Sequence, residues 1–257
     1  MTINLNKNEI NNITAKVLAA QTRQIQQFVL FIGHAHSGHS IIGAILDAHP
    51  SVAIANEVNI VNLIKNHKLN KVEIESILLH YSFCKKSTKD WHNSEYKHGI
   101  NNSHQGKTHT PLVIGDKKAG GTARILHKDF WIMHHLQNLY EDQLKVIYIK
   151  RNPIDIVAAY SHYMQQAPCQ FHVDRYLENL AVVNQSKQLL PPSSFIEIEQ
   201  STFINSPHTE IKKLFNFISI NPQPNDINSW VAHVKSDIKG KSDTINIPDE
   251  LKNQLIL

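Results

Sequence analysis

The chain has 257 residues, of which 41% are hydrophobic, enough to bury a substantial core. Lys and Arg outnumber Asp and Glu by 26 to 22, a net charge of +4, and no run of five like charges occurs. This mild excess argues against nucleic acid as the main partner and suits a small anionic ligand.

Targeting and metal-binding signals are absent from the sequence. Cys84 and Cys169 have neither metal-ligand spacing nor the pattern of a disulfide framework. The polar start, MTINLNKNEINNITAK, lacks the apolar core of a signal peptide, and the longest apolar runs are too short to span a bilayer. We therefore expect a soluble, cytoplasmic protein with no metal site.

Short apolar segments alternate with segments of helical spacing along the chain. The predicted strands are 28–32, 52–55, 112–115, 144–150 and 195–198. The predicted helices are 1–27, a helix from Gly38 to Pro50, 60–80, 126–140, a helix starting at Pro153, 174–190 and a helix starting at Ser206. This alternation predicts an α/β fold, with a parallel sheet of about five strands flanked by helices on both faces. We expect one domain over 1–257, with a polar insertion or flap at 84–111 and a tail at 221–257.

The octapeptide GHAHSGHS at 33–40 lies between a predicted buried strand and a helix. Backbone N–H groups of such a loop converge on one point and can bind an anion. Gly33 and Gly38 permit the tight path, and Ser40 can donate its hydroxyl to a phosphate oxygen. The context therefore predicts a phosphate-binding loop.

The loop differs from an ATP-binding loop at one position. The G-x-x-x-x-G-K-S pattern has a lysine that reaches the β- and γ-phosphates, and His39 stands in its place. Asp116 is the only candidate for a metal-binding acid at the end of a strand. Both observations count against a nucleoside triphosphatase.

A second cationic site follows the fourth predicted strand, where Arg151 is delivered to the same edge of the sheet. Its guanidinium is suited to bidentate phosphate binding. Ser161, ten residues later on the next helix, can face the same cleft. We expect these two residues to bind a second, separate phosphate.

In their order and spacing these motifs resemble the sulfotransferases that use 3′-phosphoadenosine 5′-phosphosulfate (PAPS). The resemblance covers about residues 28–57 and 112–218. It rests on HSGHS (36–40), LDAHPSVAIANE (46–57), GDK (115–117), RNPID (151–155) and FIEIEQSTFINSPHTEIKKLFNFI (195–218). It implies a P-loop-containing fold in which the loop holds the 5′-phosphosulfate through Ala35, His36, Ser37, Gly38, His39 and Ser40. It also implies that Arg151 and Ser161 bind the 3′-phosphate.

The chain departs from the family pattern at three positions. His36 replaces a Lys or Arg, and His39 replaces a Thr. The family's 3′-phosphate serine usually lies eight residues after the Arg, where this chain has Ala159, so either Ser161 substitutes for it or this contact is missing.

The resemblance also implies catalytic roles. His36 is the expected charge stabiliser or proton donor to the leaving group, because bound phosphate favours its charged form. Glu57 is the first candidate for general base, with His34 and His39 as rivals. Lys117 lies at the acceptor side of the cleft. The lysines of the tail, Lys235, Lys239 and Lys241, match the family's late basic segment loosely.

The leading hypothesis is an enzyme that transfers the sulfuryl group of PAPS to a hydroxyl or amine by in-line displacement. The acceptor is a small molecule, a lipid or a glycan, and a protein tyrosine stays open; its identity and the oligomeric state do not follow from the sequence. One alternative is a P-loop kinase acting on a small molecule. The other is a catalytically inactive nucleotide-binding module.

Overall fold

A computed structural model describes residues 3–20, 24–84, 99–100, 103–105, 110–235 and 240–255. Most of the predicted insertion at 84–111 lies outside these residues, as does Lys239 of the tail.

The centre of the molecule is a sheet of five strands in the order β2-β3-β1-β4-β5, in which every neighbouring pair is parallel. The strands are β1 (Gln27–Ile32), β2 (Val52–Asn56), β3 (Val113–Ala119), β4 (Leu144–Lys150) and β5 (Phe195–Glu199). All five predicted strands are therefore confirmed, although β3 continues four residues beyond its predicted end. The β1 strand lies in the middle, so the loop that follows it is at the centre of the sheet's carboxyl edge.

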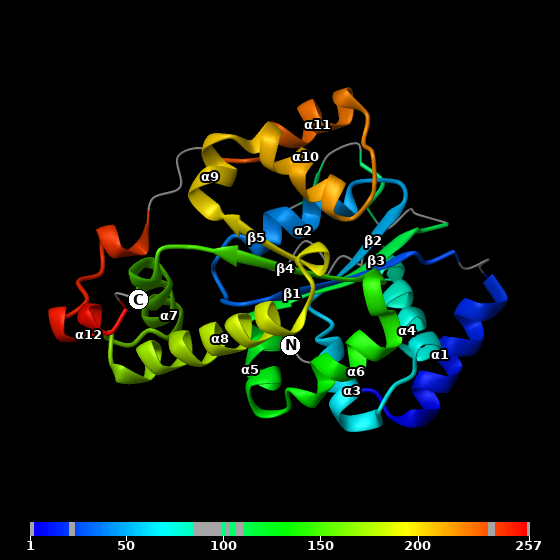
Figure 1. The fold of residues 1–257 in the computed structure, drawn as a ribbon, viewed down its shortest axis with the longest axis horizontal. Helices are drawn as coiled ribbons and strands as arrows, with labels where there is room; N and C mark the ends of the chain where they lie inside the picture. The colour runs from blue at the N-terminus through cyan, green and yellow to red at the C-terminus, as the bar shows by residue number, and fades with distance from the viewer. Residues whose placement is uncertain are drawn as a thin grey trace.

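Helices cover both faces of the sheet (Figure 1). On one face lie α2 (His39–Asp47), α9 (Gln200–Asn205), α10 (Pro207–Phe217) and α11 (Pro224–Val231). On the other lie α1 (Lys7–Ala20), α3 (Ile60–His67), α4 (Lys71–Cys84), α5 (Gly120–Lys128), α6 (Trp131–Tyr140) and α8 (Gln170–Leu189). The predicted α/β fold with helices on both faces is confirmed.

The sequence of β1 is a continuous apolar run because both faces of this strand are buried. Phe28 and Leu30 pack into the core on one face, and Val29 and Phe31 pack into the core on the other. Successive side chains of a strand point to opposite faces, so a strand buried on both sides has no polar position.

Three predicted helices differ most from the structure in their limits. The first spans Lys7–Ala20 rather than 1–27. The segment 60–80 contains two helices, because Lys68 adopts a left-handed conformation with φ 48° that ends α3. The segment 126–140 is likewise divided between α5 and α6, with a break at Asp129.

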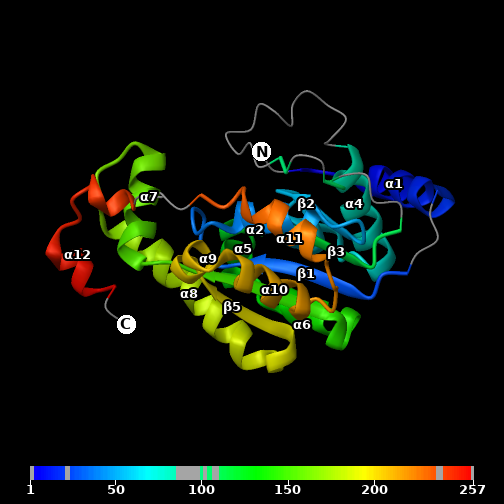
Figure 2. The same cartoon turned by 90° about the horizontal axis from the view of Figure 1, so that it is seen from above.

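The end of the tail, from Ile247 to Leu255, packs on α7 (Pro153–Met164), which follows β4. Ile247, Leu251 and Leu255 form a third apolar cluster with residues of α7 and α8. Consequently α12 (Asp249–Asn253) lies beside α7 at one end of the molecule, and α1 lies at the opposite end (Figure 2). The tail thus reaches the carboxyl edge of the sheet.

Candidate functional site

The Gly33–Ser40 loop connects β1 to α2 through a tight path. Gly33 and Gly38 have φ of 109° and 96°, and His36 between them also has a positive φ of 63°. A side chain at Gly33 would collide with the ring of Tyr148, 2.6 Å from its Cδ2. No side chain caps the N-terminus of α2. The first N–H groups of this helix are therefore available to an anion.

Lys117, from the neighbouring strand β3, brings a cation to this loop. Its Nζ lies 3.2 Å from Oγ of Ser40 and 2.8 Å from Oε1 of Glu57. The side chain is only 4% exposed. Its stem runs over Gly43 of α2, where an added Cβ would lie 2.8 Å from Lys117 Cγ. The loop therefore has a lysine beside it, although none lies in its own sequence.

Glu57 is held between two lysines at the carboxyl end of β2. One carboxylate oxygen binds Lys117 and the other binds Lys118. Burial acts to raise the pKa of Glu57, but the two lysines outweigh it and lower that pKa below its ordinary value. Glu57 is therefore a carboxylate at neutral pH.

Asp116 holds the turn that carries Glu57. Its two carboxylate oxygens accept hydrogen bonds from the backbone N–H of Val58, at 3.2 Å, and of Ile60, at 2.7 Å. Burial raises the pKa of Asp116 to about 6. Both oxygens thus serve a structural role. In the described part of the chain, no group of three His, Cys, Asp or Glu side chains could hold a metal ion.

Arg151 lies at the other side of the loop. Its Nη1 donates to the carbonyl oxygen of His36 at 2.7 Å, and its Nη2 lies 3.6 Å from Asp155. Asp155 also accepts hydrogen bonds from the backbone N–H and the hydroxyl of Ser242. The segment of the tail around Ser242, which includes Lys241, is therefore anchored next to Arg151.

The three histidines of the loop have different surroundings. His36 lies between the rings of Tyr160 and Tyr163, at centroid distances of 6.2 and 5.3 Å. Burial lowers the pKa of His36, and the charges of Arg151 and His162 lower it further. An imidazolium at this position therefore needs a nearby negative charge.

His34 and His39 are buried. Burial lowers the pKa of each ring to about 3, so both are neutral. His34 stacks on Tyr176 at 4.3 Å, and His39 Nδ1 lies 3.3 Å from Oγ of Ser37. A neutral His39 cannot replace the lysine of an ATP-binding loop.

The hydroxyl of Ser161 is already engaged in a hydrogen bond at the end of α7. Ser161 is 2% exposed, and its hydroxyl donates to the carbonyl oxygen of Gln166 at 2.8 Å. This bond closes the C-terminus of α7. A phosphate contact through Ser161 would require the bond to break.

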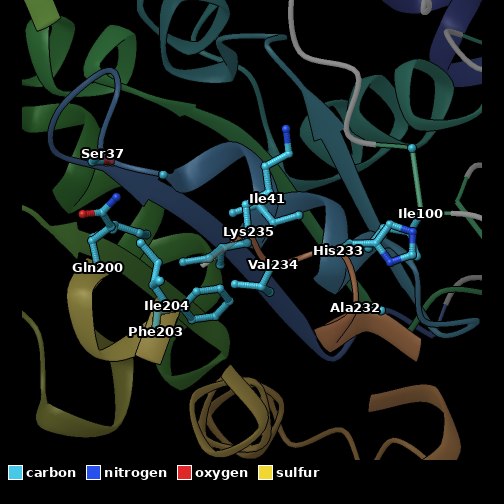
Figure 3. A pocket seen from close by; sticks show the side chains of 14 residues that line it. Ser37, Ile41, Ile100, Gln200, Phe203, Ile204, Ala232, His233, Val234 and Lys235 are labelled. Carbon is cyan, nitrogen blue, oxygen red and sulfur yellow. The ribbon is translucent and has the colours of Figure 1, made fainter. Parts of the chain in front are cut away.

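A largely apolar cavity of about 320 Å³ opens beside the loop (Figure 3). It lies between the start of α2, helix α9 and residues 232–235 of the tail. Ser37 and Gly38 line one end, and Phe203 and Val234 line the apolar wall. This cavity could not be predicted from the sequence, which gives no helical signal for α9. Lys235 of the tail is among the lining residues.

A family model described as "Sulfotransferase family" matches residues 29–224. The chain belongs to the sulfotransferase family. The resemblance inferred from the loop, GDK and RNPID is therefore confirmed.

Solved structures agree with this family at the level of the fold. The sulfotransferase domain of the Synechococcus PCC 7002 olefin synthase has a TM-score of 0.56 at 12% identity, over 91% of this chain and 94% of that chain. The sulfotransferase domain from the curacin biosynthetic pathway has a TM-score of 0.55 at 11% identity, over 91% and 96%. STF9 from Mycobacterium avium has a TM-score of 0.56 at 10% identity, over 95% and 79%. A search of curated protein sequences finds no match. Across the described residues of this sulfotransferase, no helix has the length and apolar character needed to cross a membrane.

Proposed function

We propose that this sulfotransferase transfers the sulfuryl group of PAPS to a hydroxyl or amine of an acceptor. The observation that carries the proposal is the position of Lys117, whose ammonium contacts both Ser40 of the loop and Glu57. It links the proposed donor site to the proposed general base. A cation between a leaving group and an attacking group can stabilise the charge that moves between them.

The residues around the loop fit the three parts of PAPS. The uncapped N-terminus of α2 suits the 5′-phosphosulfate, together with Ser37 and Ser40. Arg151 suits the 3′-phosphate because its guanidinium can bind two oxygens. The cavity lined by Phe203 and Val234 suits the nucleobase.

Two observations favour PAPS over ATP as the donor. The ring of His39 is neutral, so the position that holds the lysine of an ATP-binding loop offers no cation to a γ-phosphate. Asp116 uses both of its oxygens on backbone N–H groups and is not free to bind Mg²⁺. The kinase alternative therefore has less support than sulfuryl transfer.

Glu57 is the proposed general base. It is ionised at neutral pH and can accept the proton of the attacking hydroxyl or amine as the new S–O or S–N bond forms. When bound, PAPS supplies the sulfuryl group and a good leaving group. Lys117 and Lys118, which neutralise Glu57 in the free protein, can then turn toward the transferring oxygens. His36 is the proposed charge stabiliser on the leaving side, because bound phosphate would favour its protonation.

A transfer assay with PAPS as the donor tests this proposal. The protein is incubated with a panel of phenols, alcohols and amines, and release of 3′,5′-diphosphoadenosine is measured by ion-exchange chromatography. We expect wild-type protein to release it at least ~100-fold faster than Glu57→Gln with the best acceptor, the usual range for loss of a general base. Equal rates for wild type and Glu57→Gln would contradict the assignment of the base. Binding without release by wild type would favour the inactive module.

A further inference from the structure

Arg124 of α5 and Arg175 of α8 are two cations with no acidic partner among the residues that the structure describes. Arg151, Lys117 and Lys118 each form an ion pair with a carboxylate. Neither Arg124 nor Arg175 forms one with any of the described residues; they contact a carbonyl oxygen and an aromatic ring instead. Their helices pack side by side (Figure 1). The charge of Arg175 also contributes, after burial, to a lowered pKa of Arg124.

Local contacts orient both guanidinium groups. Nε of Arg124 donates to the carbonyl oxygen of Gly120 at 3.3 Å, which directs this side chain toward the N-terminus of α5. The guanidinium of Arg175 lies 4.6 Å from the centroid of the Phe171 ring, one turn earlier on α8. The remaining N–H groups of both side chains can still donate to a ligand.

The Arg124–Arg175 pair is close to the proposed site of transfer. The α5 helix starts where β3 ends, and an added Cβ on Gly120 would lie 2.7 Å from the backbone nitrogen of Ala35 in the loop. An added Cβ on Gly121 would lie 2.6 Å from Cγ of Lys118, which binds Glu57. Gly120, Gly121 and Arg124 share one face of α5, so Arg124 lies one turn, about 5 Å along the helix, from these contacts.

The α8 side of the pair is also next to the loop. Tyr176, which follows Arg175, stacks on His34 at 4.3 Å. Tyr160 of α7 accepts a hydrogen bond from Asn179 of α8 at 3.3 Å. The charges of Arg175 and Arg124 both act on this phenol. The helices α5 and α8 pack into the core on one face of the sheet, and the cavity borders the core on the other face.

We propose that Arg124 and Arg175 bind an oxyanion of the acceptor, a carboxylate, sulfate or phosphate group one helical turn from the reacting hydroxyl or amine. The inference rests on the proposed function, since it assigns the acceptor of that same site. The positive charge of Arg175 disfavours the positive charge of Arg124, and an oxyanion bound by both would offset this repulsion. The fork of each guanidinium matches two oxygens of such a group. The acceptor is then an anion before it is sulfated.

Thermal unfolding with inorganic phosphate as the probe tests the Arg124–Arg175 pair. Wild type, the Arg124→Gln/Arg175→Gln double variant and Lys128→Gln are saturated with 3′,5′-diphosphoadenosine so that the donor site is filled. Phosphate is then titrated at constant ionic strength, with acetate in a parallel arm to separate tetrahedral oxyanions from carboxylates. Lys128, on the same helix as Arg124, is the matched control for loss of one exposed charge.

We expect phosphate or acetate to raise the Tm of wild type and of Lys128→Gln. In the double variant we expect the apparent Kd of that anion to rise at least ~10-fold, the loss of about one charge-assisted hydrogen bond. The proposal would be overturned if the anion changed the Tm of wild type and of the double variant by the same amount, whether it raised both values or neither. If 3′,5′-diphosphoadenosine itself fails to stabilise wild type, the proposed function is wrong. In that case, the Tm shifts that phosphate and acetate produce in wild type and in the double variant are compared without nucleotide. This comparison still decides whether Arg124 and Arg175 bind oxyanions.

Discussion

The ammonium group of Lys117 lies 3.2 Å from the hydroxyl of Ser40, although the two residues come from different strand–helix units of the sheet. In an ATP-binding loop the cation comes from the loop itself. In this sulfotransferase the equivalent position is His39, which is neutral, and the cation comes from β3. The proposed donor site and Glu57, the proposed base, therefore share one lysine.

Replacing Lys117 by Met is expected to weaken binding of 3′,5′-diphosphoadenosine by ~10- to 100-fold, the value of one or two charge-assisted hydrogen bonds. Glu57 keeps Lys118 as a partner, so we expect the fold to persist. Isothermal titration calorimetry measures the affinity. The matched control is Lys150→Met, which removes a half-exposed lysine at the end of β4. Equal losses in the two variants would mean that Lys117 contributes only net charge.

Replacing Arg151 by Gln is expected to reduce the preference for 3′,5′-diphosphoadenosine over 5′-AMP. The guanidinium is the proposed partner of the 3′-phosphate, so the affinity for 5′-AMP should change less than the affinity for the diphosphate. Because Arg151 also donates to the carbonyl oxygen of His36, some loss with both ligands is expected. The quantity to measure is the ratio of the two dissociation constants. An unchanged ratio in the variant would place the 3′-phosphate elsewhere.

Substituting Gly43 by Ala is expected to weaken ligand binding with little change in the stability of the fold. Ala is a better helix former than Gly by about 1 kcal/mol, yet the new Cβ would lie 2.8 Å from Cγ of Lys117. The lysine must shift, and its ammonium moves relative to Ser40. We predict a Tm within a few degrees of wild type and a weaker affinity for 3′,5′-diphosphoadenosine. A full-affinity variant would show that the position of Lys117 is not critical.

The buried ring of His34 makes stability depend on pH. Its pKa is about 3 in the folded protein against 6.5 when unfolded, so the unfolded chain binds the extra proton as pH falls below 6.5. Stability is therefore full above that pH and falls by up to about 1.4 kcal/mol per pH unit between 6.5 and 3. His39 acts with the same sign, whereas Asp116, with its pKa raised to about 6, acts with the opposite sign between 3.8 and 6.

Urea unfolding of wild type and His34→Phe at pH 5 and pH 7 isolates the contribution of His34. Phe preserves the stack on Tyr176 and does not titrate. Between pH 7 and pH 5 we expect wild type to lose about 2 kcal/mol more than the variant, the product of that slope and the interval of about 1.5 pH units below pH 6.5. Parallel pH profiles would mean that His34 is protonated in the folded state.

The sheet and the loop could be predicted from the sequence because their signals are local. A strand buried on both faces must be apolar throughout, as FVLFI is, and the path of the loop needs glycine at positions 33 and 38. The start of α5 could not be predicted, because Gly120 and Gly121 disfavour a helix. Glycine is needed at these two positions because of tertiary contacts: a side chain at either position would collide with Ala35 or Lys118.

The partners within the candidate site depend on contacts between distant segments. The bond of Lys117 to Ser40 joins residues 77 positions apart, and no spacing rule predicts it. The sequence predicts a phosphate contact for Ser161, whereas in the structure its hydroxyl donates to the carbonyl oxygen of Gln166 at the end of its own helix. The Arg124–Arg175 pair likewise exists only because α5 packs on α8.

The most direct test of the central claim is the affinity of wild-type protein for 3′,5′-diphosphoadenosine, measured by calorimetry in EDTA beside 5′-AMP and, separately, ATP with Mg²⁺. A PAPS-dependent enzyme is expected to bind the diphosphate without metal and at least ~10-fold more tightly than 5′-AMP, as one additional charge-assisted contact requires. Equal affinity for the diphosphate and 5′-AMP, or tighter binding of ATP with Mg²⁺, would contradict the account.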